Sequence, residues 1–490
     1  MEIVDFGFCA MLAGVSGTGT SKASSSSAAL TSGALPHALL VGVKLPGVDD
    51  AEFEASLAEL ERLVKTLGYS VVGRITQARA SLSPAAVLGE GKLAELAAFT
   101  GGSGEAGVVV PRKTDKARAR REAVADGKTI PSADATGEPD DDAFGEASSA
   151  PLQLIAVDHE ISPSQLRNLE RATGIEVLDR TGVIIEIFHR HAHSREARMQ
   201  VEIARLRYES PRVRESPRGK ERQQGRGAGE AGLELDRRKI RDRIAELKEQ
   251  LESLQREYGV RRAQRQEARR VALVGYTNAG KSSLMRGLTG SDVYVENKLF
   301  ATLDTTVRAL SPEVEPRILV SDTVGFIKKL PHDLVASFKS TLDEASDASL
   351  LLHVVDASDP GWESQLHVTR EVLAEIGAHG VPSRLVMNKV DRLAEAELGA
   401  LRAALPDAWF LSAKSATDVA DLRQRIIAFF EKSYVEAEVL VPFSEQRLLA
   451  EMHATMNVLG TRYEEDGVYV HVRSDAGALD RVRARLQASA

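Results

Sequence analysis

Short apolar runs alternate with segments of helical period between residues 38 and 190. The apolar runs have the length of buried strands and lie at 38–43, 69–75 and 152–157. Helical periods lie between these runs, at 50–67 and 92–99. Ser162 suits a helix N-cap, because Pro163 follows it at the first helical position. Strands that alternate with helices predict a parallel α/β domain over 38–190.

Two segments have no hydrophobic period. Residues 1–37 are rich in Ser, Ala, Gly and Thr, which predicts a disordered tail. Residues of about 101–150 join a basic run to an acidic one and predict a long exposed insertion. Within this insertion, 108–110 has the pattern of a strand.

A heptad repeat indicates a helical connector over 191–268. Its apolar positions, four, three, four, three and four residues apart, are Ile240, Ile244, Leu247, Leu251, Leu254 and Tyr258. The segment 195–208 offers a partner helix, with Met199, Ile203 and Leu206 on one side. The two patterns predict antiparallel helices. The glycine-rich loop between them, 211–232, has no apolar face and is expected to be exposed.

A second α/β region is predicted over 269–434, beginning with the apolar strand 271–274. A small α+β domain is predicted over 437–490, with a helical period at 445–459, a strand at 467–472 and a closing helix from Ala476. The expected fold class is α/β. It comprises an N-terminal α/β domain, a two-helix antiparallel connector, a mostly parallel sheet with helices on both faces, and a small C-terminal domain.

Composition restricts the location of the chain. Hydrophobic residues make up 43% and charged residues 27%, as in ordinary soluble domains. No apolar run reaches the roughly 20 residues that a membrane-spanning helix needs. The first charges, Glu2 and Asp5, do not suit a secretion signal, and the single cysteine, Cys9, fits a reducing compartment. A cytoplasmic protein without a membrane span is therefore expected.

Positive charge is concentrated in one segment. The net charge is −8, but residues 189–270 hold 23 Lys and Arg against 14 Asp and Glu. A basic segment in an acidic chain indicates a local surface for an anionic partner such as RNA.

Residues 275–282 match the phosphate-loop pattern GxxxxGK[ST], between an apolar strand and a helical segment. Backbone N–H groups in such a loop point at phosphates, assisted by the positive end of the helix. Lys281 is expected to neutralise the outer phosphates, and the Ser282 hydroxyl to ligate Mg²⁺. The loop consists of Gly275, Tyr276, Thr277, Asn278, Ala279, Gly280, Lys281 and Ser282.

Two further segments extend the predicted phosphate and metal site. In Asp322-Thr323-Val324-Gly325, which follows an apolar strand, the Asp is expected near Mg²⁺ and the Gly N–H near the γ-phosphate. In Phe300-Ala301-Thr302-Leu303-Asp304, Thr302 is expected to complete the Mg²⁺ shell. Thr305 and Thr306 are alternatives to Thr302.

Two later motifs select the base. Asn388-Lys389-Val390-Asp391 follows another apolar strand, and the Asp391 carboxylate can accept two hydrogen bonds from guanine. Adenine lacks this pair of donors and would leave the carboxylate unpaired. Ser412-Ala413-Lys414 offers backbone contact to the guanine oxygen. The region 269–434 is therefore predicted to be a P-loop GTPase domain that binds GTP and GDP.

The sequence does not reveal how the attacking water is oriented. Phe326 stands where many GTPases have a glutamine, so slow intrinsic turnover is expected. Lys281 and Asn278 are the candidate catalytic residues. Asn278 resembles the phosphate-loop asparagine of potassium-dependent GTPases; either it helps to hold K⁺ or it only caps the loop.

With these motifs the chain resembles the HflX family of ribosome-associated GTPases. Stretches outside the nucleotide motifs agree with that family, namely 88–92 (LGEGK), 162–169 (SPSQLRNL) and 179–182 (DRTG). The resemblance extends from about Ala38 to the C-terminus, except for the insertion. The glycine-rich loop departs from the family pattern RGPGETKLE, because 226–234 reads RGAGEAGLE and Gly232 replaces the lysine.

The resemblance implies binding to the large ribosomal subunit and its RNA, with a role in splitting or rescuing stalled ribosomes. A monomer is expected off the ribosome. The candidate RNA contacts are basic residues of the loop: Arg212, Arg214, Arg218, Lys220, Arg222 and Arg226. The alternative for such residues is a solvated helix face, and this is the interpretation favoured for the interleaved charges of 237–270.

A GTPase for tRNA modification or for membrane transport is disfavoured, because Cys9 lies at the wrong end of the chain and no membrane helix is expected. A GTPase for tRNA modification would need a catalytic partner or a reactive C-terminal cysteine, and one for transport would need membrane helices. An RNA-binding or ribosome-assembly scaffold with little hydrolysis is the alternative from a different class.

Overall fold

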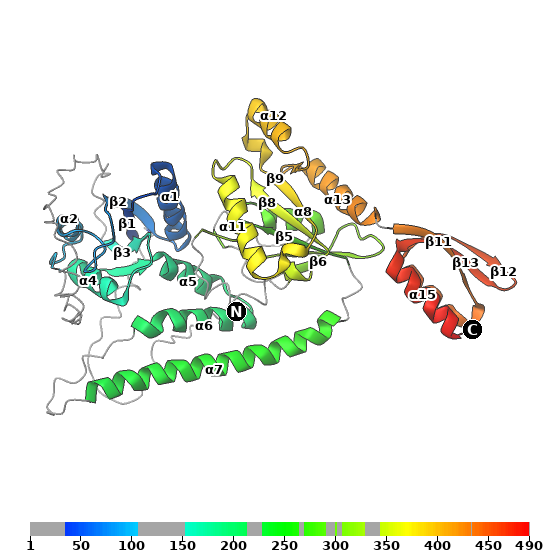
Figure 1. Cartoon of the computed structure of the whole chain (residues 1–490), viewed down its shortest axis with the longest axis horizontal. Coiled ribbons are helices and arrows are strands. Elements are labelled where there is room, and N and C mark those ends of the chain that lie inside the picture. The colour runs from blue at the N-terminus through cyan, green and yellow to red at the C-terminus, as the bar shows by residue number, and fades with distance from the viewer. Residues whose placement is uncertain are drawn as a thin grey trace, which may run out of the picture.

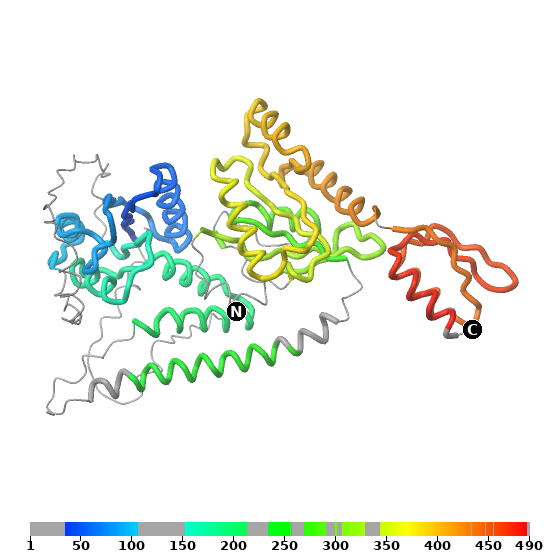
Figure 2. The backbone as a smooth tube through the Cα atoms, in the orientation of Figure 1, coloured from blue at the N-terminus to red at the C-terminus, as the bar shows by residue number. Residues whose placement is uncertain are grey.

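The structure, a computed structural model, describes residues 35–105, 152–212, 228–263, 269–290, 299–300, 306–328, 344–432 and 434–489. Figures 1 and 2 show the N-terminal domain, the helical connector, the nucleotide domain and the C-terminal domain. None of the described helices is long and apolar enough to cross a bilayer. Residues 1–34 of the predicted tail, the strand at 108–110 and most of the basic loop lie outside the described residues; the predicted end of the tail is one residue too late, because His37 begins a strand.

The N-terminal domain is built on a parallel sheet in the order β2-β1-β3-β4. Its strands are β1 (His37–Lys44), β2 (Ser70–Ala78), β3 (Leu152–Val157) and β4 (Glu176–Asp179), and its helices are α1 (Asp50–Thr66), α2 (Glu90–Thr100), α4 (Pro163–Thr173) and α5 (Arg180–His191). Alternate residues of β1 face two different cores. Leu40 packs with α1 and α5, whereas Leu39 and Val41 pack with α2 and α4. The predicted parallel α/β fold is confirmed.

The predicted start of α4 is also confirmed. The Ser162 hydroxyl accepts from the Gln165 backbone N–H at 3.3 Å, and the Gln165 side chain accepts from the Ser162 N–H at 2.8 Å. Gln165 and Asn168 donate to the carbonyls of Ser83 and Ala85. This stretch therefore anchors α4 to the chain segment that precedes α2.

The connector consists of α6 (Arg195–Glu209), a short 3-10 turn at Ser210–Arg212 and the long helix α7 (Ala228–Ala263). Figure 1 shows α7 running along α6, and Arg243 of α7 bonds to Glu202 of α6 at 3.0 Å. The two helices pack through the predicted apolar positions Met199, Ile203, Leu206, Ile244, Leu247, Leu251 and Leu254.

The predicted extent of the glycine-rich loop is wrong at its C-terminal end. Helix α7 begins at Ala228, inside the predicted loop of 211–232. Gly229 and Gly232 each weaken a helix by about 1 kcal/mol relative to Ala. Their neighbours Ala228, Glu230, Ala231, Leu233 and Glu234 are good helix formers and extend α7 through them.

The nucleotide domain has a sheet of six strands in the order β10-β9-β8-β5-β7-β6. Adjacent strands are parallel except β6, which is antiparallel to β7. The strands are β5 (Arg269–Gly275), β6 (Thr306–Ala309), β7 (Ile318–Asp322), β8 (Leu350–Asp356), β9 (Ser383–Asn388) and β10 (Trp409–Phe410). Helix α11 (Trp362–Glu375) covers one face, and α8 (Lys281–Thr289) and α13 (Ala416–Glu431) the other; α12 (Glu395–Ala404) lies between β9 and β10 in sequence. The carboxyl ends of β5, β7, β8 and β9 therefore meet at one edge, where α/β sheets bind ligands.

The C-terminal domain is an antiparallel sheet in the order β11-β13-β12. It contains β11 (Tyr434–Val441), α14 (Gln446–Thr455), β12 (Asn457–Glu464), β13 (Gly467–Asp475) and α15 (Ala476–Ser489). Two predicted boundaries are wrong: β11 begins before residue 437, and the helix predicted over 445–459 ends at Thr455. The residues that follow pair with β13, and this pairing overrides a helical period that the sequence alone carries further.

Candidate nucleotide site

The phosphate loop connects β5 to α8. Gly275 has a φ of +151°, and a Cβ at this position would lie 2.1 Å from the Val354 carbonyl oxygen on the neighbouring strand β8. Only glycine fits there, because the backbone turns sharply against the next strand. The turn brings residues 276–280 over the carboxyl edge of the sheet, in front of the N-terminus of α8.

Lys281 is buried beneath this loop. Its Nζ donates to the carbonyl oxygens of Gly275 at 3.1 Å and Tyr276 at 3.0 Å. Burial lowers the pKa of Lys281 to about 8, and the nearby Asp322 opposes that shift. The lysine is thus a poorly hydrated cation at the helix N-terminus, where an anion would be stabilised most.

Ser282 and Asp322 offer the oxygen atoms that suit a metal ion. The Ser282 hydroxyl donates to the Asp322 carboxylate at 2.7 Å. A hydroxyl and a carboxylate are hard oxygen ligands of the kind that Mg²⁺ takes in combination with phosphates and water. The described residues contain no cluster of three or more His, Cys, Asp or Glu. The pair therefore suits a metal that is shared with a phosphate ligand.

Thr323, Val324 and Gly325 follow β7 with different roles. The Thr323 hydroxyl donates to the Leu273 carbonyl at 2.8 Å, and Val324 is in the core, so neither side chain faces a ligand. A Cβ at Gly325 would lie 2.8 Å from Thr277 Cγ2 and 3.0 Å from Lys281 Nζ. Gly325 is therefore close to the lysine that would meet the outer phosphates.

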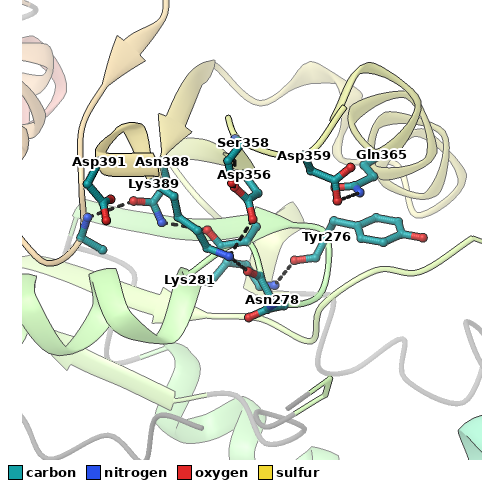
Figure 3. Close-up of polar contacts among 12 residues, drawn as sticks. Tyr276, Asn278, Lys281, Asp356, Ser358, Asp359, Gln365, Asn388, Lys389 and Asp391 are labelled. Carbon is teal, nitrogen blue, oxygen red and sulfur yellow. Dashed lines mark hydrogen bonds and ion pairs between the residues drawn. The ribbon is translucent and has the colours of Figure 1, made fainter. Parts of the chain in front are cut away.

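The base end is assembled from three loops, shown in Figure 3. Asn388 is buried; its amide nitrogen donates to the Ala279 carbonyl at 2.8 Å and its amide oxygen accepts from the Ala413 N–H at 2.9 Å. Lys389 donates to the Asn278 carbonyl at 2.6 Å and to Asp356 at 2.7 Å. The motif at 388–391 thereby ties the phosphate loop to the segment 412–414.

Asp391 presents its carboxylate at this end. Val390 and Asp391 lie in a short 3-10 turn, Val390–Arg392. The Ser412 hydroxyl donates to one carboxylate oxygen at 2.7 Å, and Lys414 is 3.4 Å from the other. These contacts, Ser412 foremost, lower the pKa of Asp391 below its ordinary value. An ionised carboxylate has two acceptor oxygens, which suits the paired N–H donors of a guanine base.

Comparison with known proteins agrees with this geometry. Family models match residues 54–120 with 143–189 ("GTP-binding GTPase N-terminal"), 191–265 ("GTP-binding GTPase Middle Region") and 270–389 ("50S ribosome-binding GTPase"). The GTPase HflX of Gluconacetobacter diazotrophicus is 60% identical over 93% of this chain and 98% of its own. The chain belongs to the HflX family of GTPases.

Two further matches have lower identity to this chain. The GTPase HflX of Magnetococcus marinus is 42% identical over 69% of this chain and 79% of its own. A crystal structure of a GTP-binding protein from Sulfolobus solfataricus in complex with GDP is 23% identical, covers 80% of this chain and 98% of its own, and has a TM-score of 0.40. The family model of the N-terminal domain leaves 121–142 unmatched, a gap inside the predicted insertion of about 101–150.

Two carboxylates at the base end of the site were not predicted from the sequence. Asp356 ends β8, and accepts from Lys389 and from the Ser358 hydroxyl at 2.6 Å. Asp418, in the first turn of α13, accepts from the Ser412 N–H at 2.7 Å. Asp356 could have been recognised, because it follows a buried parallel strand as Asp322 does. Asp418 carries no such signal.

The first residue of the predicted switch segment packs on the N-terminal domain. The Phe300 ring packs edge-to-face on Phe188 of the N-terminal domain, with centroids 4.6 Å apart. Thr306, one of the alternatives to Thr302, lies in β6 opposite Asp322. Ala301, Thr302, Leu303 and Asp304 lie outside the described residues, as does Thr305.

Arg212, one of the predicted RNA contacts, bonds within the protein. Its guanidinium donates to Asp179 at 2.9 Å and to the carbonyls of Ile161 and Tyr208 at 3.2 and 2.8 Å. It also lies over the Tyr208 ring, 3.6 Å from the centroid. The protein itself thus engages this guanidinium. The other candidates, Arg214, Arg218, Lys220, Arg222 and Arg226, lie outside the described residues.

Proposed function

We propose that this GTPase is a switch protein that binds GTP and GDP with Mg²⁺ and acts on the large ribosomal subunit in the cytoplasm. The observation that carries the proposal is the buried cation Lys281, one residue before the Ser282–Asp322 pair. Lys281 would neutralise the outer phosphates, while Ser282, Thr302 and Asp322 would hold Mg²⁺ directly or through water. Bound Mg²⁺ would neutralise charge that develops on the phosphates.

Hydrolysis would be slow without a partner. The ring of Phe326 is buried, at 2% exposure, so this position offers no polar group to an attacking water. Asn278 is exposed at the rim of the phosphate loop, with a φ of +60°, and is the candidate for holding K⁺. Turnover measured in KCl and in NaCl tests this role, and equal rates in the two salts would exclude it.

The ribosome is the partner that the family relationship favours. The model that matches 270–389 is described as a 50S ribosome-binding GTPase, and the splitting or rescue of stalled ribosomes is the role we propose. Residues 189–270 carry 23 basic side chains against 14 acidic ones, so this segment suits phosphate backbones. The protein would be a monomer off the ribosome.

Co-sedimentation with large subunits, in GDP and in a non-hydrolysable GTP analogue, tests the proposal. We expect binding with the analogue, and binding in neither state would refute the ribosome assignment. A variant in which Arg214, Arg218 and Arg222 of the loop are all replaced by Gln should bind large subunits more weakly, and its binding should depend less on salt concentration. The control variant replaces Arg237, Arg238 and Arg241 of α7 by Gln, which removes the same charge, and should bind large subunits as the unchanged protein does.

The alternative is an RNA-binding or ribosome-assembly scaffold that hydrolyses little GTP, which the buried Phe326 favours. Single-turnover hydrolysis with and without large subunits separates the two functions. A switch should be stimulated by the subunit, whereas a scaffold should bind without stimulation.

A further inference from the structure

The N-terminal domain and the nucleotide domain share one hydrophobic core. Leu60 and Leu63 of α1 and Ile184 and Phe188 of α5 belong to the same buried cluster as Phe326. Figure 1 shows α1 and α5 on the side of the N-terminal domain that faces the nucleotide domain. The Leu299 N–H donates to the Thr66 hydroxyl at 3.3 Å, so α1 also contacts the segment that precedes Thr302.

A buried polar network crosses this shared core. Arg180, at the start of α5, donates to Asp158 at 2.8 Å and to Glu59 of α1. Its guanidinium is also 3.3 Å from the Lys328 carbonyl. Arg180 is 2% exposed and Glu59 5%. A buried charge is tolerated when it is paired, so each partner depends strongly on the others.

Tyr276 of the phosphate loop extends this network into the nucleotide site. Its hydroxyl donates to Glu59 and accepts from the Lys328 N–H at 2.5 Å. Burial and the nearby Glu59 raise the pKa of Tyr276, so the hydroxyl keeps its proton and remains a donor. Lys328 is therefore held through its backbone N–H by Tyr276 and through its carbonyl by Arg180.

The segment between Gly325 and Lys328 is fixed at its other end by the phosphate loop. The Thr277 N–H donates to the Phe326 carbonyl at 2.8 Å, and the Phe326 N–H donates to the Gly275 carbonyl at 3.1 Å. These bonds place Gly325 beside Lys281. Three residues after Gly325, the backbone of Lys328 is held by Arg180 of the N-terminal domain and by Tyr276, whose hydroxyl in turn bonds to Glu59.

We propose that Glu59, Arg180 and Tyr276 form an interdomain latch that positions Gly325 for the γ-phosphate, so that the N-terminal domain sets the preference for GTP over GDP. Glu59 and Arg180 act as positioning residues through Tyr276 and Lys328. GDP has no γ-phosphate to meet the Gly325 N–H, so the latch contributes to the binding of the triphosphate alone. Coupling between sites is reciprocal, so the triphosphate must in turn stabilise the docked N-terminal domain.

The test uses the full-length protein without ribosomes, because the inference rests on GTP binding and not on ribosome binding. Glu59→Gln removes the buried charge, and Tyr276→Phe keeps the ring in the core but removes the hydroxyl. Each should lower affinity for a non-hydrolysable GTP analogue roughly tenfold while leaving GDP affinity within about twofold. The double variant should lose little more than the larger single loss, because both changes break one network.

Glu61→Gln is the matched control on α1, because Glu61 is an exposed partner of Lys65 and should leave both affinities unchanged. Thermal unfolding shows whether each variant is folded. If Glu59→Gln does not fold, Tyr276→Phe carries the test alone. Equal losses for analogue and GDP, or no loss in a folded variant, would overturn the latch. Failure of subunit binding would refute the ribosome proposal and leave this result intact.

Discussion

At the base end of the nucleotide site, Asn388, Asp391 and Ser412 bond to other residues of the nucleotide domain. At the phosphate end, Tyr276 and Lys328 bond to Glu59 and Arg180 of the N-terminal domain. The two ends also differ in burial, because the Asp391 side chain is 35% exposed and that of Glu59 is 6% exposed. Solvent weakens the ion pair between Asp391 and Lys414 at the base end, whereas the buried pair of Arg180 and Glu59 at the phosphate end is costly to break.

This difference separates two properties of the GTPase. Recognition of guanine needs the loops of one domain, whereas discrimination between GTP and GDP needs the contact between two domains. A change at the base end should therefore affect both nucleotides equally, and a change at the phosphate end should affect them unequally.

The largest expected effect is at the base end. Asp391→Asn replaces an ionised acceptor with an amide and loses two charge-assisted hydrogen bonds of about 1.5–3 kcal/mol each, so affinity should fall roughly 10²–10⁴-fold. GDP and the GTP analogue should lose the same factor. Xanthine nucleotides, which have a carbonyl in place of the 2-amino group, should gain affinity. Nucleotide titration measures all of these, with the exposed Asp407→Asn as control.

Gly325→Ala tests the phosphate end by steric means. The new Cβ would lie 2.9 Å from Thr277 Cα and 3.0 Å from Lys281 Nζ, a crowding that costs about 1–3 kcal/mol. Affinity for the GTP analogue should fall roughly tenfold or more, with a smaller loss for GDP. Gly380→Ala, where a Cβ meets nothing within 4 Å, is the control. An equal loss for both nucleotides would remove the distinction between the two ends.

Raising the pH should weaken nucleotide binding through the phosphate end of the site and not through the base end. Burial lowers the pKa of Lys281 to about 8 in the free protein, and bound phosphates would restore the charged form, so binding takes up a proton above that pH. Affinity should fall about tenfold between pH 7 and pH 9. The lowered pKa of Asp391 keeps the base end ionised over this range. Calorimetry in buffers of different ionisation enthalpy measures the proton uptake, and a flat profile would contradict it.

The smallest effect should come from the face of the N-terminal domain that α2 and α4 cover. Ser162→Ala removes the N-cap of α4 and should cost about 1 kcal/mol of unfolding free energy. Nucleotide affinities should not change. Helix α4 packs with α2 in one core of the N-terminal domain, whereas α1 and α5 pack in the other core, which includes residues of the nucleotide domain. A shift in the GTP-to-GDP preference would show that coupling is spread over the whole domain.

The sequence predicted most elements within a few residues, because hydrophobic period and capping are local properties. It failed at 456–459, where pairing with β13 replaced a helical period. It also did not show the internal contacts of Arg212, because its partner Asp179 lies 33 residues away in the chain.

The nucleotide motifs predicted a GTP-binding site from the sequence alone, since each motif carries its expected phosphate, metal or base contacts within a few consecutive residues. Only the tertiary structure joined this site to the N-terminal domain. Glu59 and Tyr276 are 217 residues apart, and Arg180 and Lys328 are 148 apart. No local pattern marks a buried glutamate or arginine as a partner of the phosphate loop. Their pairing is decided by the packing of α1 and α5 against the nucleotide domain, which excludes water and leaves each charge dependent on the other.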